Sequence, residues 1–106
     1  MTAYSQLIQQ NIAAAAAYTE YSIVIPPAVF DLTLALRSAG SPANIFWYTA
    51  PSGSVSPGSS GNLPAVYNTI PPNGSRWLPG KRGGQVIYFQ VDQSNQVLEA
   101  DYYGDV

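Results

Sequence analysis

Two carboxylates near the end of the sequence, Glu99 and Asp101, form the pair best spaced for acid–base chemistry. They are two residues apart in a stretch with strand composition, so both point to one face about 7 Å apart. That separation is near the spacings that glycosidases use. A working pair also needs one carboxyl with a raised pKa inside a cleft. Because alternating charges on a strand are usually solvated, we expect no enzymatic activity.

The residue types that hold most metals and activate most nucleophiles are missing. The 106 residues include no cysteine and no histidine, which excludes Cys or His metal sites, Ser-His-Asp triads and Cys-His dyads within one chain. Asp92 or Asp105 beside the carboxylate pair could make a weak Ca²⁺ site, but the spacing matches no calcium-binding loop. We therefore expect no metal and no cofactor.

The segment from Gly74 to Arg82 superficially resembles a phosphate-binding loop. Its glycines are separated by five residues instead of four, Arg82 stands at the Ser/Thr position, and no helical pattern follows. A nucleotide site is therefore excluded.

Three of the four basic residues, Arg76, Lys81 and Arg82, lie in the same segment around Trp77. Basic side chains beside an aromatic are typical of single-stranded nucleic acid grooves. Three charges are few, however, and a net charge of −2 argues against nucleic acid binding. Two interpretations stay open: a salt-bridging patch for a protein partner, or a solvated loop with Trp77 packed in the core.

Eight tyrosines and two tryptophans give the chain an unusual number of amphipathic rings. One hypothesis is a carbohydrate-binding platform built from Trp47, Tyr48, Tyr67, Tyr88 and Tyr103, with Trp77 as a further candidate. Such rings also suit half-buried strands and protein interfaces.

The first twenty residues carry a helical pattern. Ser5 could cap a helix, and five alanines from Ala13 to Ala17 have the best helix propensity. A stripe at helical spacing is formed by Tyr4, Leu7, Ile8, Ile12 and Ala15. We predict a helix over Ser5–Tyr18, so that residues 1–20 form a helix or arm and residues 21–106 a β domain. The stripe could pack on the domain's own sheet or on a neighbour, and an arm that orders only on assembly is the alternative.

From Tyr21 onward the hydrophobic period is two, as in strands. Strands are predicted over 21–25, 30–37, 43–49, 64–70, 75–78, 85–92 and 96–103. The last two flank the polar linker Gln93–Asn95, which indicates a β-hairpin. Residues 51–63, ten of which are Gly, Pro or Ser, predict a long exposed loop. Six or seven short strands of this kind predict a mainly β fold, an antiparallel sandwich or partly closed barrel with one N-terminal helix.

Composition indicates how such a domain is used. Charged residues make up 9% of the chain, against about 25% in typical proteins, and a weakly charged surface suits packing in an assembly. The apolar stretch Ile12–Ala17 is too short to span a membrane and no Lys or Arg precedes it, so we expect neither membrane insertion nor export by the general secretion route. Assembly in a cytoplasm is the simplest expectation.

From Tyr21 to the end, the order of features resembles the small β-sandwich proteins of tailed-phage virions. The segments that carry the resemblance are FDLTLALRSAG, ANIFWYTAP, the Gly/Ser insertion, RWLPGKRGG and QVIYFQVDQSNQVLEADYY. The resemblance implies a sandwich with a terminal arm or helix that decorates or cements the head, often as a trimer, or joins head and tail. The Ala-rich N-terminus departs from the extended arms common in these proteins, which leaves the mode of attachment open.

We therefore expect a virion structural protein, assembled in the host cytoplasm, that decorates and reinforces the capsid. Its expected partners are the major capsid protein or other virion proteins, and further copies of itself, with a trimer favoured. The expected contact residues are Tyr4, Leu7, Ile8, Ile12, Arg76, Trp77, Lys81 and Arg82. The alternative is a carbohydrate- or receptor-binding module of a phage tail or fibre.

Overall fold

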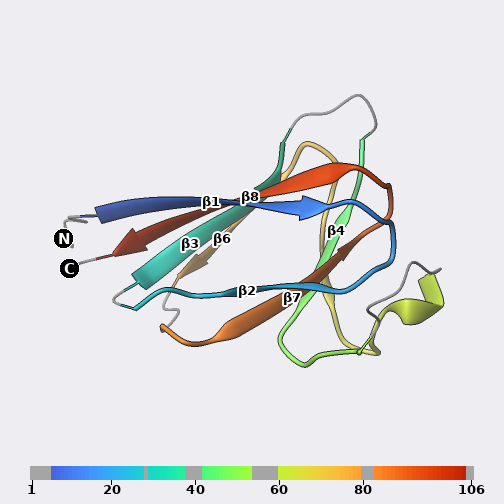
Figure 1. The fold of residues 1–106 in the computed structure, drawn as a ribbon, viewed down its shortest axis with the longest axis horizontal. Helices are drawn as coiled ribbons and strands as arrows, with labels where there is room; N and C mark the ends of the chain where they lie inside the picture. The colour runs from blue at the N-terminus through green and yellow to red at the C-terminus, as the bar shows by residue number, and fades with distance from the viewer. Residues whose placement is uncertain (1–5, 28, 38–41, 54–59, 80–82, 105–106) are drawn as a thin grey trace.

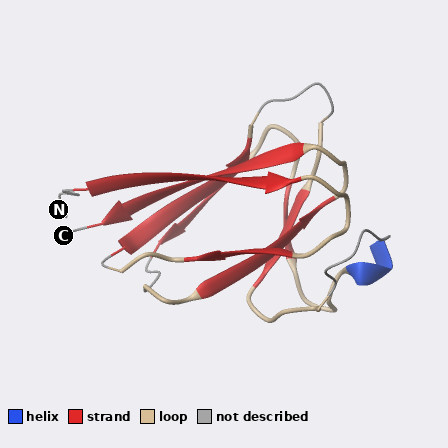
Figure 2. Cartoon of the chain, viewed as in Figure 1, coloured by secondary structure: helices blue, strands red, loops and turns tan. Residues whose placement is uncertain are grey.

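The computed structural model describes residues 6–27, 29–37, 42–53, 60–79 and 83–104 (Figure 1). Within these ranges the ordered elements are nearly all strands, with one turn of 3₁₀ helix (Figure 2). In chain order the elements are β1 (Gln6–Ala14), β2 (Tyr21–Val24), β3 (Val29–Leu36), β4 (Ile45–Tyr48), η1 (Ser60–Asn62), β5 (Asn68–Ile70), β6 (Ser75–Pro79), β7 (Val86–Val91) and β8 (Gln96–Gly104). No helix in the described ranges is long and apolar enough to cross a membrane.

The strands form two four-stranded antiparallel sheets, ordered β1-β8-β3-β6 and β2-β7-β4-β5. Consecutive strands alternate between the sheets, except that β4 and β5 are neighbours. This order is that of a jelly roll, a double-sheet β architecture. The predicted mainly β, antiparallel sandwich is confirmed. The prediction of six or seven strands is wrong, because the first described segment adds an eighth strand.

One face of each sheet packs into a shared core. Every second residue of β8 is buried, and β7 buries Ile87, Phe89 and Val91 on its core side, with the intervening Gln90 buried as well. These side chains join Leu32 and Leu34 of β3 in one hydrophobic cluster that spans both sheets. The period of two that the sequence predicts for the β7 and β8 segments is therefore confirmed on their core side. Each fully buried large side chain contributes about 1.5–3 kcal/mol to the stability of the fold.

The predicted helix over Ser5–Tyr18 is wrong. Residues 6–14 pair with β8 without interruption, from Gln6 opposite Gly104 to Ala14 opposite Gln96. Ile8 and Ile12 pack against the core, whereas the residues between them are exposed. Residues four apart share a face in a strand as well as in a helix, so this spacing fits both. Pairing along the whole of β8 outweighs the helix propensity of the alanines.

The predicted hairpin across Gln93–Asn95 is also wrong, because β7 and β8 belong to different sheets. The linker is instead a corner between the sheets. Asn95 has a positive φ of 58° and its backbone N–H donates to the carbonyl of Ala15. Just before the corner, the Asp92 carboxylate accepts hydrogen bonds from the backbone and side-chain amides of Asn44, at 2.8 and 2.7 Å. Polar residues that tolerate positive φ serve both kinds of turn.

Candidate functional site

The carboxylate pair lies on the outer face of the β1-β8-β3-β6 sheet. Glu99 and Asp101 share this face as predicted, and with Gln9, Asn11 and Arg37 they line a polar hollow of about 300 Å³. The register places Gln9 opposite Asp101 and Asn11 opposite Glu99.

Glu99 is not placed as a catalytic acid. Its Oε2 is 3.2 Å from Nε of Arg37, and the two side chains are 43% and 51% exposed. A solvated carboxylate that pairs with a cation lacks the buried setting that acid catalysis requires. Among the described residues, no cluster of three acidic side chains could hold a metal ion.

Trp77 lies on the same outer face and is 60% exposed, so the interpretation that it packs in the core is wrong. It pairs with Thr33, and Thr33 pairs on its other side with Asp101. Neighbouring strands are about 4.8 Å apart, so Trp77 stands two strands from Asp101, about 10 Å away. The next residue, Leu78, is buried and supplies the core contact of β6.

The basic cluster predicted around Trp77 is not brought together in the described part of the chain. Arg76 precedes Trp77 in β6, so the two side chains leave the strand on opposite sides. Lys81 and Arg82 lie outside the described residues. Arg76 and Trp77 are both exposed, but they belong to different faces.

The predicted N-terminal contact stripe is divided by the strand geometry. Leu7 is 54% exposed on the outer face, whereas Ile8 and Ile12 are partly buried against the core. Tyr4 lies outside the described residues. Of the described part of this stripe, Leu7 is therefore the side chain most open to a partner.

The proposed carbohydrate platform is not assembled as one surface. Trp47 points into the core and is 7% exposed, and Tyr103 belongs to the other sheet. Tyr48 and Tyr88 do stack on the outer face of the β2-β7-β4-β5 sheet, with ring centroids 6.1 Å apart. Tyr67 comes immediately before β5 of this sheet.

A second group of rings, which sequence reasoning missed, lies beside that stack. Phe46 stacks on Tyr18 at 6.1 Å and meets Tyr67 edge-on at 5.5 Å. Such aromatic pairs add about 0.5–1.5 kcal/mol beyond burial. These contacts fix the linker before β2 and the approach to β5 against the outside of β4.

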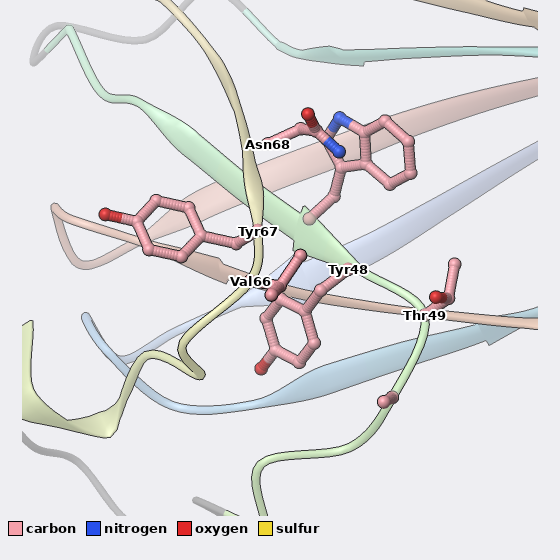
Figure 3. Close-up of a pocket in the computed structure, with 7 residues that line it drawn as sticks. Tyr48, Thr49, Val66, Tyr67 and Asn68 are labelled. Atoms are coloured by element: carbon pink, nitrogen blue, oxygen red, sulfur yellow. The ribbon is translucent and has the colours of Figure 1, made fainter.

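A cleft of about 210 Å³ opens where β4 ends and β5 begins (Figure 3). It is lined by Trp47, Tyr48, Thr49, Ala50, Val66, Tyr67 and Asn68. Val66 lies beside the ring of Tyr48, and the ring of Tyr67 points the other way (Figure 3). The cleft is smaller than the usual ligand pocket of about 300–1,000 Å³. It is large enough for a single side chain or ring.

Within the described part of the chain, an extended polar network ties Ser52, Gly53 and Asn62 to the sheet. Oε1 of Glu20 accepts hydrogen bonds from the Tyr48 hydroxyl at 2.7 Å and from the backbone N–H and hydroxyl of Ser52 at 2.6 and 2.9 Å. Oε2 accepts one from the Gly53 N–H at 3.0 Å. The buried Gln90 donates to the Tyr48 hydroxyl and to the carbonyl of Asn62, at 3.0 and 2.9 Å.

The network changes the acidity of its members. Burial alone would raise the pKa of the Glu20 carboxyl, but the hydrogen bonds from Ser52, Tyr48 and Gly53 together lower it below its ordinary value. Burial raises the pKa of the Tyr48 hydroxyl; hydrogen bonds with Ser52 and Gln90 oppose this rise, and the Glu20 carboxylate adds to it. Glu20 is therefore a charged anchor. No local sequence pattern identifies Glu20 as an anchor, because its hydrogen-bond partners are 28 to 33 residues away in sequence.

No protein-family model matches this sequence, and no curated protein sequence matches it. A chain from a structural report on Bacillus endospore appendages, described there as a novel family of disulfide-linked pili, is similar in structure. It is 13% identical, the match covers 100% of this chain and 96% of that one, and the TM-score is 0.34. This chain has no cysteine. A similarity of that size indicates neither a function nor a partner.

Proposed function

We propose that this protein is a structural subunit of a phage virion that decorates the capsid and packs against the major capsid protein or another virion component. The observation that carries the proposal is that several charged groups already interact within the chain. Glu20 and Asp92 accept hydrogen bonds within the chain, and Glu99 pairs with Arg37. Among the described residues, these four groups already interact within the chain, which leaves fewer unpaired charges to desolvate when an outer face meets another protein; interface cores are depleted of charged residues because desolvation is costly.

The fold is compatible with this role. Double-sheet jelly rolls occur in viral capsid proteins, in lectins and in cupins. Fold does not assign function, so the virion assignment is supported by the resemblance carried by the segments from FDLTLALRSAG to QVIYFQVDQSNQVLEADYY. Leu7 and Trp77, exposed on one outer face, are the described side chains that we expect to contact a partner.

The test is binding of the purified protein to particles of the encoding phage that lack it. We expect saturable co-sedimentation and additional density on the particle surface by cryo-electron microscopy. Because few charges take part, the bound fraction should change less than twofold between about 50 and 500 mM salt. Absence of the protein from purified wild-type particles by mass spectrometry, with no binding to the deficient particles, would refute the proposal.

A glycan-binding module is the second candidate, favoured by the exposed Trp77 on the same outer face as the polar hollow of Glu99 and Asp101, two strands away from Asp101. An aromatic face with neighbouring amides and carboxylates can receive a sugar ring. The test is a glycan array followed by tryptophan fluorescence titration. Trp47 is buried, so a ligand on this face should change the signal of Trp77 alone and lose its effect in Trp77→Ser. An array without hits would exclude this candidate.

A further inference from the structure

The outer edge of β1 is a long row of backbone donors and acceptors. β1 ends the strand order β1-β8-β3-β6, and its inner edge pairs with β8 over all nine residues. No strand in the described part of the chain pairs with its outer edge. Such an edge is a template for pairing with another strand.

The three other sheet edges carry features that oppose strand addition. β6 contains Arg76 and ends at Pro79, which has no backbone N–H. β5 has three residues and is followed by Pro71, and β2 has four residues with Pro26 two positions beyond its end. Short length, charge and proline are the usual protections of an edge strand. β1 has none of these, since its sequence QLIQQNIAA is uncharged and free of proline, and its register with β8 has no bulge.

We propose that β1 pairs antiparallel with β1 of a second copy of this chain, around a two-fold axis at Gln10. The two β1-β8-β3-β6 sheets then form one continuous eight-stranded sheet. The proposal concerns this chain alone and does not depend on the virion role.

The sequence of β1 is self-complementary in this register. With Gln10 opposite itself, Ile8 stands opposite Ile12, Gln9 opposite Asn11, and Leu7 opposite Ala13. A two-fold axis perpendicular to the sheet places the core-side faces of the two β1 strands on one side of the joined sheet and their outer faces on the other side. The partly buried Ile8 and Ile12 therefore cover each other across the interface, on the core side. On the outer side, amides meet amides, and these can hydrogen-bond.

Electrostatics do not oppose this pairing. No residue of β1 is charged, so no like charges meet in the new strand pair. The nearest carboxylates, Glu99 and Asp101, are on β8. Three strand spacings separate the β8 strands of the two copies, about 14 Å, which exceeds the screening length of about 8 Å at physiological salt. Pairing through one edge of each copy closes after two subunits, so it gives a dimer and does not by itself give the trimer that the resemblance implies.

The first test is the mass in solution, by light scattering and analytical ultracentrifugation from about 1 to 500 μM. The chain of 11.3 kDa should reversibly reach twice that mass.

Two variants at exposed positions of the outer face test the register. Gln9→Lys with Asn11→Lys places like charges opposite each other twice and should weaken the dimer at least tenfold at low salt. Gln9→Lys with Asn11→Glu places opposite charges there and should keep the dimer.

A matched control changes the edge of the other sheet. Ser22→Lys with Val24→Lys adds two lysines at exposed positions of β2, also two residues apart, and should leave the dimer intact. Circular dichroism and thermal unfolding at low concentration check that each variant is folded. A wild-type chain that stays monomeric at 500 μM overturns the proposal. So does a dimer dissociation constant that rises less than tenfold in Gln9→Lys/Asn11→Lys at low salt, or that rises by as much in the β2 control.

A cross-link tests the position of the axis. The chain has no cysteine, so Gln10→Cys introduces one thiol per subunit. Directly opposed residues of antiparallel strands have Cα atoms about 4.5–5.5 Å apart, within the range that a disulfide spans. Mild oxidation should give a covalent dimer that denaturants do not separate. Gln93→Cys, at an exposed corner position, is the control. Equal cross-linking of both variants would contradict the pairing.

Discussion

Glu20 is the charged group whose removal has the most predictable cost. Glu20→Gln keeps the shape of the side chain but removes its charge and replaces one acceptor oxygen with a donor. The carbonyl oxygen can keep the three hydrogen bonds now made to Oε1, from the Tyr48 hydroxyl and the two groups of Ser52. The new NH₂ group then faces the Gly53 N–H, so that hydrogen bond is lost.

The magnitude follows from the kind of hydrogen bond that changes. A hydrogen bond to a charged group contributes about 1.5–3 kcal/mol and a neutral one about 0.5–1.5 kcal/mol. Three bonds weakened by about 1 kcal/mol each, together with one bond of up to about 3 kcal/mol lost, set an upper limit of about 6 kcal/mol. Glu20 is only partly buried, so solvent screening reduces this figure. We expect a loss of about 2 kcal/mol of unfolding free energy, or about 8 °C in melting temperature for a chain of this length.

The assay is urea unfolding of both proteins, followed by circular dichroism and tryptophan fluorescence at a series of pH values. The pKa of Glu20 is lowered in the folded state, so its contribution is present above the ordinary glutamate pKa of 4.5 and disappears as pH falls through the folded value. The stability difference between wild type and Glu20→Gln should be constant from pH 7 to about 5 and should narrow below about 4.5.

The control for this experiment is Glu99→Gln, which removes an exposed ion pair with Arg37. We expect it to cost less than about 1 kcal/mol. Equal effects of Glu20→Gln and Glu99→Gln at pH 7, or a Glu20→Gln difference that does not narrow in acid, would refute the account of Glu20 as an anchor.

Three further substitutions test other parts of the fold. Phe89→Ala should destabilise by about 3–5 kcal/mol in urea unfolding, because Phe89 is fully buried in the shared core. Gly83→Ala should lower the unfolding free energy by about 1–3 kcal/mol, since a Cβ at that position would be 2.7 Å from Cα of Pro27. Unchanged stability would show that the backbone at Gly83 or Pro27 can move apart at little cost. Burial raises the pKa of Tyr102 to about 12, so stability should fall between about pH 10 and 12, and Tyr102→Phe should show a smaller decline, with Tyr48, whose pKa is also raised, contributing the rest.

The strands from β2 to β8 could be predicted because each carries its own local signal. Phe89 and its alternating neighbours mark a buried strand, and prolines such as Pro26 mark where a strand ends. The N-terminal strand could not be predicted in this way. The Ile8–Ile12 spacing satisfies both periods, and the partner that decides between them is β8, more than 80 residues later in the chain.

The pairing of strands is the feature of the fold that the sequence predicts least well, as the linker Gln93–Asn95 shows. A turn signal says that the chain changes direction but does not say which sheet receives the next strand. The same holds for the candidate site. Glu20, Ser52 and Gln90 come from separate segments and carry no motif, so their network is visible only after folding. The position of Trp77 stayed open in the sequence because large aromatic residues are often buried, whereas its alternation with the buried Leu78 places it on the outer face.

The position of β8 between β1 and β3 has a consequence for synthesis on the ribosome. The side-chain oxygen of Gln10 accepts a hydrogen bond from the Tyr102 hydroxyl, and Tyr102 is translated 92 residues after Gln10. At about 5–20 residues per second this takes roughly 5 to 18 s. During that time β1 and β3 lack the strand that joins them, and both edges of β1 are open. Nascent chains on one polysome would then compete with β8 for β1, so early contact between chains is a hazard built into the strand order.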